Sequence, residues 1–155
     1  MRLRIPAVLL LTVMAFASVA PAYAAMPPEQ GIAQSASLYK RLGGYDALAA
    51  VTDDFLGRLS TDSQIGRFFK GVSTDSQKRI RQHVIDFLCN ATGGPCVYMG
   101  RDMKTVHNGL NITEDDWNAS VKHLVTTLDK FKVPEREKTE VLAAISGLKG
   151  DIVGR

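Results

Sequence analysis

The segment from residue 103 to residue 110 contains a histidine that could support metal chemistry. Met103, Val106, His107 and Leu110 recur at i, i+3, i+4 and i+7, which places them on one face of a short helix. The imidazole of His107 therefore points to the same side as apolar side chains. A neutral imidazole against an apolar wall is a good ligand for a transition metal or a haem iron. The alternative is a core histidine that hydrogen-bonds a backbone carbonyl.

Two further histidines differ in their surroundings. His83 lies on the apolar stripe of a helix that we expect over residues 75–92. His123 falls on the polar side of a later helix, and we interpret it as a solvated surface residue. Because His83 and His107 lie on apolar faces of different helices, they could bind a planar metal centre from both sides. A zinc site is not favoured, since too few inward nitrogen, sulfur or carboxylate ligands accompany them.

Residues 1–24 have the layout of a secretory signal peptide. Arg2 and Arg4 precede an almost uninterrupted apolar run over residues 7–20, and the small residues that end at Ala24 offer a cleavage site. The alternative is an uncleaved membrane anchor, for which the run is short. The sequence therefore predicts export, to the periplasm or to the outside of the cell.

After the signal peptide, we expect a flexible tether over residues 25–36 and one domain over residues 37–155. The chain has 19 basic and 16 acidic residues, a net charge of +3. Cleavage would remove Arg2 and Arg4 and leave a net charge of +1. A nearly neutral mature chain favours neither nucleic acid nor an anionic membrane as a partner, and we expect no stable membrane insertion of it.

Cys89 and Cys96 lie seven positions apart, across Gly93, Gly94 and Pro95. In an oxidising compartment such a pair forms a disulfide by default, and two free thiols or a redox pair are the alternatives. The bond would fasten the end of a helix to the following loop and contribute about 2 kcal/mol. Neither cysteine belongs to a Cys-x-x-Cys-His motif, so covalent attachment of haem is not expected.

From Ser37 onward the pattern predicts an all-α fold, because no stretch alternates in the manner of a strand. We expect helices over residues 37–42, 45–59 and 75–92, a brief one around residues 65–69, and two more that begin near residues 113 and 134. Their inward positions recur at helical spacing: Leu48, Val51, Phe55, Leu59, Ile65, Phe68, Phe69, Ile80, Val84, Phe87, Leu88, Ala91, Trp117, Val121, Leu124, Leu128, Val141, Leu142, Ile145 and Leu148.

Several motifs, taken in order over residues 37–152, resemble a group I truncated haemoglobin. They are Ser37-Leu38-Tyr39-Lys40-Arg41-Leu42-Gly43-Gly44, Asp54-Phe55, Phe68-Phe69, Gly93-Gly94-Pro95, Tyr98-x-Gly100-Arg101-x-Met103-Lys104-x-x-His107 and Gly109-Leu110-Asn111-Ile112-Thr113. Each motif is weak by itself, whereas their order and spacing together are specific. The resemblance implies a two-over-two helical sandwich around a noncovalent b-type haem.

The resemblance also implies roles for individual residues. His107 matches the proximal iron ligand, and Phe69 matches the aromatic residue that packs against the porphyrin. The remaining expected pocket residues are Phe55, Leu56, Phe68, Ile80, Val84, Phe87, Tyr98, Met103, Ile112, Trp117, Val121 and Ile145. Arg79, Arg101 and Lys104 are candidates for pairing with the haem propionates, and ordinary surface charge is the alternative for each.

The distal side departs from the common family pattern. Many members carry a tyrosine and two glutamines that hydrogen-bond oxygen, whereas this chain has Leu56, Ile80 and Val84 at the matching positions. His83 is similar to a histidine that binds the iron directly in some cyanobacterial members when no external ligand is present. We therefore predict that His83 is a reversible sixth iron ligand. The alternative is a distal histidine that only hydrogen-bonds a ligand or a propionate.

The resemblance implies reversible binding of oxygen, nitric oxide or carbon monoxide, in competition with His83. Nitric oxide dioxygenation is the catalytic extension that we consider, and it requires a separate electron donor because the chain contains no flavin or nicotinamide domain. One alternative is a periplasmic bis-histidyl haem protein that transfers electrons. Another is a haem-free helical sensor or interaction module.

Overall fold

The computed structural model describes residues 36–155; the expected signal peptide and most of the expected tether lie outside them. The described part contains helices and no strand, which confirms the predicted all-α class. The elements, in chain order, are α2 (Leu38–Arg41), α3 (Gly44–Thr61), the 3-10 helix η1 (Ile65–Phe69), α4 (Thr74–Ala91), α5 (Met103–His107), α6 (Glu114–Lys130), α7 (Glu135–Ser146) and α8 (Lys149–Ile152).

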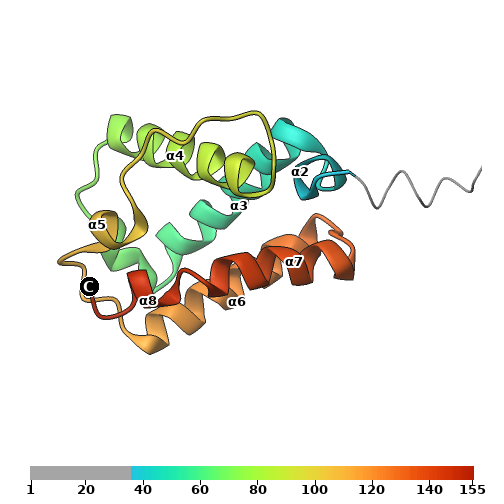
Figure 1. Cartoon of the computed structure of the whole chain (residues 1–155). Coiled ribbons are helices and arrows are strands. Elements are labelled where there is room, and N and C mark those ends of the chain that lie inside the picture. Colours follow the sequence, from blue (N-terminus) through green and yellow to red (C-terminus); the bar gives the residue numbers. More distant parts are fainter. Residues whose placement is uncertain (1–35) are drawn as a thin grey trace, which may run out of the picture.

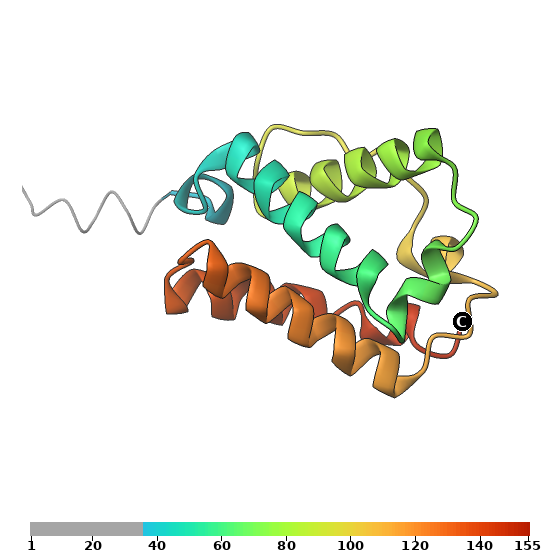
Figure 2. The same cartoon turned by 180° about the vertical axis from the view of Figure 1, so that it is seen from behind.

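The long helices form two layers. In Figure 1, α3 and α4 make the upper layer, and α6 and α7 run side by side below them. Figure 2 shows the same arrangement from behind, with α3 crossing between α4 and α6. The core where the layers meet, which we call the core cluster, consists of Val51 from α3, Leu124 and Leu128 from α6, and Val141 from α7. The apolar stripes of three helices are thus buried against one another, as their spacing predicts.

Side-chain caps set the first residues of several helices. The Ser73 hydroxyl accepts a hydrogen bond from the backbone N–H of Ser76 and begins α4. Thr113 and Asp116 form a reciprocal capping box at the first turn of α6. Pro134 lies immediately before α7, where its missing N–H leaves no helical hydrogen bond unmade. Each of these residues marks the predicted beginning of its helix to within about one position.

Three expectations about the helices need correction. The helix around His107 ends at that residue, so Leu110 lies beyond it and is exposed. The last helix does not continue to Leu148: α7 ends at Ser146, and Leu148 is the N-cap of the separate helix α8. The buried face of α4 is also not the predicted apolar stripe, because its buried residues are Ile85 and Cys89, while Ala91 is exposed. The contact with α3 is the main one that α4 makes, and we attribute the complete burial of Ile85 and Cys89 to it.

The segment between α4 and α5 runs back along α4 and brings α5 beside the N-terminal half of that helix (Figure 1). The predicted disulfide is present in this segment, with Cys89 and Cys96 joined and their Cα atoms 5.7 Å apart. Gly94 lies inside the closed loop, and a Cβ at this position would lie 2.6 Å from the ring of Tyr39. The loop therefore needs a glycine there. In the described part of the chain, the helices are too short or too polar to span a bilayer.

Candidate functional site

His107 lies at the C-terminal end of α5 and is half-buried. The Asp102 side chain caps the helix by accepting a hydrogen bond from the backbone N–H of Thr105. His107 Nδ1 lies 2.7 Å from the backbone carbonyl oxygen of Met103. Because a carbonyl can only accept, Nδ1 must carry the proton, and Nε2 then presents a free lone pair. The carbonyl contact and metal ligation, which the sequence offered as alternatives, are therefore compatible.

His83 lies on the side of α4 opposite the helix's buried face. Residues two positions apart on a helix point about 200° apart, so His83 points away from Ile85, and it is exposed. This corrects the expectation of an inward histidine on a buried stripe. Its ring packs edge-to-face against the ring of Tyr98, with centroids 6.1 Å apart and planes at 82°. The ring of Phe87, one turn along α4, contacts the same tyrosine at 5.4 Å.

Two of the three aliphatic residues predicted for the distal side, Leu56 and Ile80, are brought together, whereas Val84 does not line their groove. Leu56 from α3, Phe69 from η1 and Ile80 from α4 line one groove of about 320 Å³. Asp53 and Arg81 also line it and form an ion pair between α3 and α4. The Arg81 guanidinium holds the pKa of the Asp53 carboxyl below its usual range, because it hydrogen-bonds the charged form. The groove therefore combines an apolar wall with a charged pair.

The other predicted pocket residues differ in their packing. Phe55 and Ile145 lie against the core cluster, and Trp117 is buried in α6. The half-buried members of the set are Phe68, Val84, Phe87, Tyr98, Met103, Ile112 and Val121. Arg79, Arg101 and Lys104 are exposed, and Arg79 donates a hydrogen bond to the Ser76 hydroxyl. Their pairing with propionates stays a prediction.

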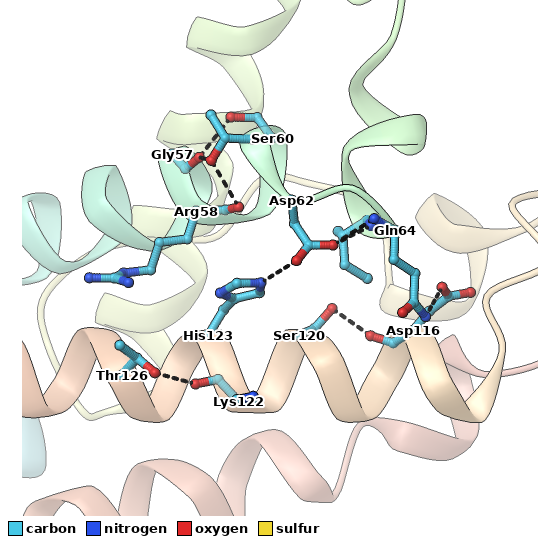
Figure 3. A network of polar contacts seen from close by, with 12 residues as sticks. Gly57, Arg58, Ser60, Asp62, Gln64, Asp116, Ser120, Lys122, His123 and Thr126 are labelled. Atoms are coloured by element: carbon cyan, nitrogen blue, oxygen red, sulfur yellow. Dashed lines mark hydrogen bonds and ion pairs between the residues drawn. The ribbon is translucent and has the colours of Figure 1, made fainter.

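Sequence reasoning missed a polar network between α6 and the turn that leads to Phe69. His123 is not a solvated surface residue: its Nε2 lies 2.9 Å from a carboxylate oxygen of Asp62, and about a quarter of its side chain is exposed. Figure 3 shows His123 on α6 pointing toward Asp62, which ends α3. Backbone N–H groups and His123 all donate to this carboxylate, which lowers the pKa of Asp62 to about 2.

Asp116 completes this network two turns before His123 on the same side of α6. It is almost fully buried and accepts hydrogen bonds from Gln64 and Thr113 and from the guanidinium of Arg67. These donors hold the pKa of Asp116 far below its usual range, with Arg67 the largest cause. The only available sequence signal was the capping box, since the partners Gln64 and Arg67 lie about fifty residues away.

Comparison with known proteins identifies the fold that carries these groups. Residues 37–153 match the family of bacterial-like globins. The chain belongs to this family. It is 36% identical over 120 residues to the group 1 truncated hemoglobin GlbN of Mycolicibacterium paratuberculosis, covering 77% of this chain and 86% of that one. It is 33% identical over 119 residues to the corresponding protein of a Nostoc species, covering 77% of this chain and 98% of the relative.

Solved structures agree with this assignment. The truncated hemoglobin of Tetrahymena pyriformis, in its ferric form, superposes with a TM-score of 0.70 at 28% identity, and the match covers 77% of this chain and all of that one. The 2/2 hemoglobin of a Synechococcus species, crystallised in the cyanomet state with covalently attached heme, gives a TM-score of 0.70 at 28% identity, with 77% and 100% covered. This globin is therefore a truncated haemoglobin of group 1 with the two-over-two fold.

Family membership means that the chain binds haem and a gaseous ligand. The structure is consistent with that cofactor at the proximal position, where the hydrogen bond between His107 and Met103 fixes the imidazole tautomer that a metal ligand requires. Leu56, Phe69 and Ile80 supply apolar surface of the kind that a porphyrin contacts, but neither His107 nor His83 lines their groove. The described residues contain no cluster of three or more ligating side chains.

Proposed function

We propose that this globin holds a noncovalent b-type haem through His107 and uses His83 as a reversible second iron ligand, so that diatomic gases bind by displacing His83. The observation that carries the proposal is the 2.7 Å contact between His107 Nδ1 and the Met103 carbonyl. It orients the ring and leaves Nε2 free to bind a metal. When bound, the haem supplies an iron that takes oxygen, nitric oxide or carbon monoxide as an axial ligand.

The distal residues favour His83 as a competitor for external ligands. Leu56 and Ile80 cannot donate a hydrogen bond, so they offer no polar stabilisation to a gas. His83 is exposed, and its contact in the described part of the chain is with an aromatic ring. An imidazole without a strong hydrogen-bonding partner has no such contact to give up when it binds a metal. The gas would then bind only in the fraction of molecules in which His83 is displaced.

The test is the visible absorption spectrum of the haem-loaded protein, ferric and reduced, at neutral pH without added ligand. Low-spin six-coordinate bands are expected in both states, and His83→Leu should convert them to high-spin five-coordinate bands. Gln82→Leu, which changes an exposed neighbour on the same helix, serves as the control and should leave the bands unchanged. A spectrum that His83→Leu does not alter would rule out ligation by His83.

Carbon monoxide binding to the reduced protein separates gas chemistry from electron transfer. Two imidazole ligands in both oxidation states suit electron transfer, whereas gas binding needs an open iron in an appreciable fraction of molecules. We expect fast and complete binding at low carbon monoxide concentration, with a rate that reaches a plateau, set by the release of His83, only at high carbon monoxide concentration. Slow or incomplete binding at low concentration would favour electron transfer instead. Nitric oxide dioxygenation is part of the proposal, and nitrate formation should then require an added electron donor.

We also propose that the protein is exported. The pattern of residues 1–24 supports this, and so does the disulfide between Cys89 and Cys96, because such bonds persist mainly in oxidising compartments. Cell fractionation with an antibody against the globin domain tests it. A mature chain shortened near Ala24 in the exported fraction is expected, and a full-length chain confined to the cytosol would contradict export.

A further inference from the structure

The loop between α4 and α5 places one aromatic side chain directly against His83. Tyr98 contacts the His83 ring edge-to-face at 6.1 Å and the Phe87 ring in the same manner at 5.4 Å. Edge-to-face pairs at such separations are attractive beyond the area they bury. His83 and Phe87 lie one turn apart on α4, so Tyr98 spans a single turn of the helix and contacts both rings.

Three features hold Tyr98 in this position. Its hydroxyl donates a hydrogen bond of 2.7 Å to the carbonyl of Arg101. Gly100 lies so close beneath the ring that an added Cβ would be 2.3 Å from it. The disulfide fixes Cys96, two positions earlier, to Cys89, which is fully buried near the end of α4.

We propose that Tyr98 is a positioning residue for His83: the disulfide-anchored tyrosine restricts the His83 imidazole to a narrow range of orientations and thereby raises the fraction of molecules in which His83 binds the iron. This inference rests on the proposed function of His83. An exposed side chain that moves freely loses rotamer freedom when it binds a metal, and a side chain already held by its neighbour loses less. Loss of the Tyr98 ring therefore weakens ligation by His83.

The first experiment needs no haem. In the apoprotein, the NMR signal of the His83 Cε1–H reports the ring current of Tyr98 directly. Tyr98→Leu should move this signal toward its value in a free histidine, whereas Tyr98→Phe, which keeps the ring, should leave it near the wild-type position. An identical His83 signal in the wild type and in Tyr98→Leu would overturn the contact on which the proposal depends.

The second experiment uses the haem-loaded, reduced protein. The equilibrium constant for His83 binding, from carbon monoxide rapid mixing, should fall by at least about threefold in Tyr98→Leu and by much less in Tyr98→Phe. Reduction of the disulfide in the wild type should lower it in the same direction. If Tyr98→Leu fails to fold, Gly100→Ala provides a second variant, because its Cβ would displace the ring.

The outcomes separate this inference from the proposed function. A five-coordinate wild-type spectrum means that His83 does not bind iron, and it overturns both. A six-coordinate wild type whose His83 affinity is the same in Tyr98→Leu supports the proposed function and overturns the inference alone. If the affinity of His83 for the iron is weakened in Tyr98→Leu and close to the wild-type value in Tyr98→Phe, the inference is supported. A general loss of loop structure would not depend on whether position 98 carries an aromatic ring.

Discussion

Substitution of Asp116 by asparagine removes the negative charge of a buried carboxylate that accepts four hydrogen bonds. One carboxylate oxygen accepts from the backbone N–H and hydroxyl of Thr113, at 2.9 and 2.8 Å, and from Arg67 at 2.5 Å. The other accepts from the Gln64 side chain at 2.8 Å. Asparagine is isosteric and can keep these contacts if the Gln64 amide rotates, because both amides carry a donor and an acceptor. Asp116→Asn therefore isolates the effect of charge.

The expected loss in free energy of unfolding is about 2 kcal/mol. Hydrogen bonds to a charged group contribute roughly 1.5–3 kcal/mol and neutral ones roughly 0.5–1.5, so neutralising an acceptor with several donors removes a few kcal/mol. The Arg67 side chain is 43% exposed, which screens its share and lowers the total. Urea unfolding at pH 7, followed by circular dichroism with the same haem content in each protein, measures the loss. We expect the Tm to fall by roughly 5–10 °C.

The control is Asp115→Asn, which changes an exposed residue in the first turn of the same helix. It weakens only the interaction with the helix dipole and should cost under about 0.5 kcal/mol. The pH dependence gives a second check. The pKa of Asp116 is lower in the folded state than in the unfolded state. Its contribution to the free energy of unfolding is therefore complete above the unfolded pKa of about 3.9, and it is lost as the pH falls from there toward the folded pKa. The reasoning would be refuted if Asp116→Asn lost no more free energy of unfolding than Asp115→Asn, or if the loss in Asp116→Asn were the same at pH 3 as at pH 7.

Three other predictions concern stability and titration. Thr52 is fully buried, and its hydroxyl has no hydrogen-bond partner in the described part of the chain. The nearly isosteric Thr52→Val should therefore raise the free energy of unfolding by about 1 kcal/mol in urea, and a lower value than the wild type's would contradict this. Replacement of both Cys89 and Cys96 by alanine should cost about 2 kcal/mol for the short loop that they close, and added reductant should then destabilise only the wild type. His123→Gln should raise the pKa of Asp62 above its value of about 2, as followed by NMR of its carboxyl carbon, but two backbone N–H groups should keep it under about 4.

The sequence predicted the helices well because local spacing and caps determine them. Thr113 and Pro134 mark the beginnings of α6 and α7, and Val141 is buried as expected, with Leu142 and Ile145 packed against the core cluster. The orientation of α4 was less predictable, because Ile80 and Ile85 lie on different apolar sides of this helix and the sequence alone allows either side to be the buried one. Packing against α3 decides which face is fully buried. That contact is between residues far apart in the sequence, so the local pattern of α4 does not predict it.

The proximal half of the site was visible in the sequence, and the polar network was not. His107 stood out because its neighbours at helical spacing are apolar, and the hydrogen bond to Met103 is a contact within one helical turn. His123 and Asp62 are 61 residues apart, so their pairing follows from the tertiary structure alone. A polar side of a helix predicts contact with water in an isolated helix, but here it faces the end of α3.

The core cluster and α5 differ in what keeps them ordered. The core cluster joins three long helices that bury one another's side chains, whereas α5 has five residues and none of them is buried. A helix of this length is not stable by itself. Without haem, the chain would therefore keep the core cluster packed, while the segment around His107 opens transiently and becomes accessible to proteases. Proteolysis would then remove molecules that never acquired the cofactor, and the surviving population would consist of loaded ones.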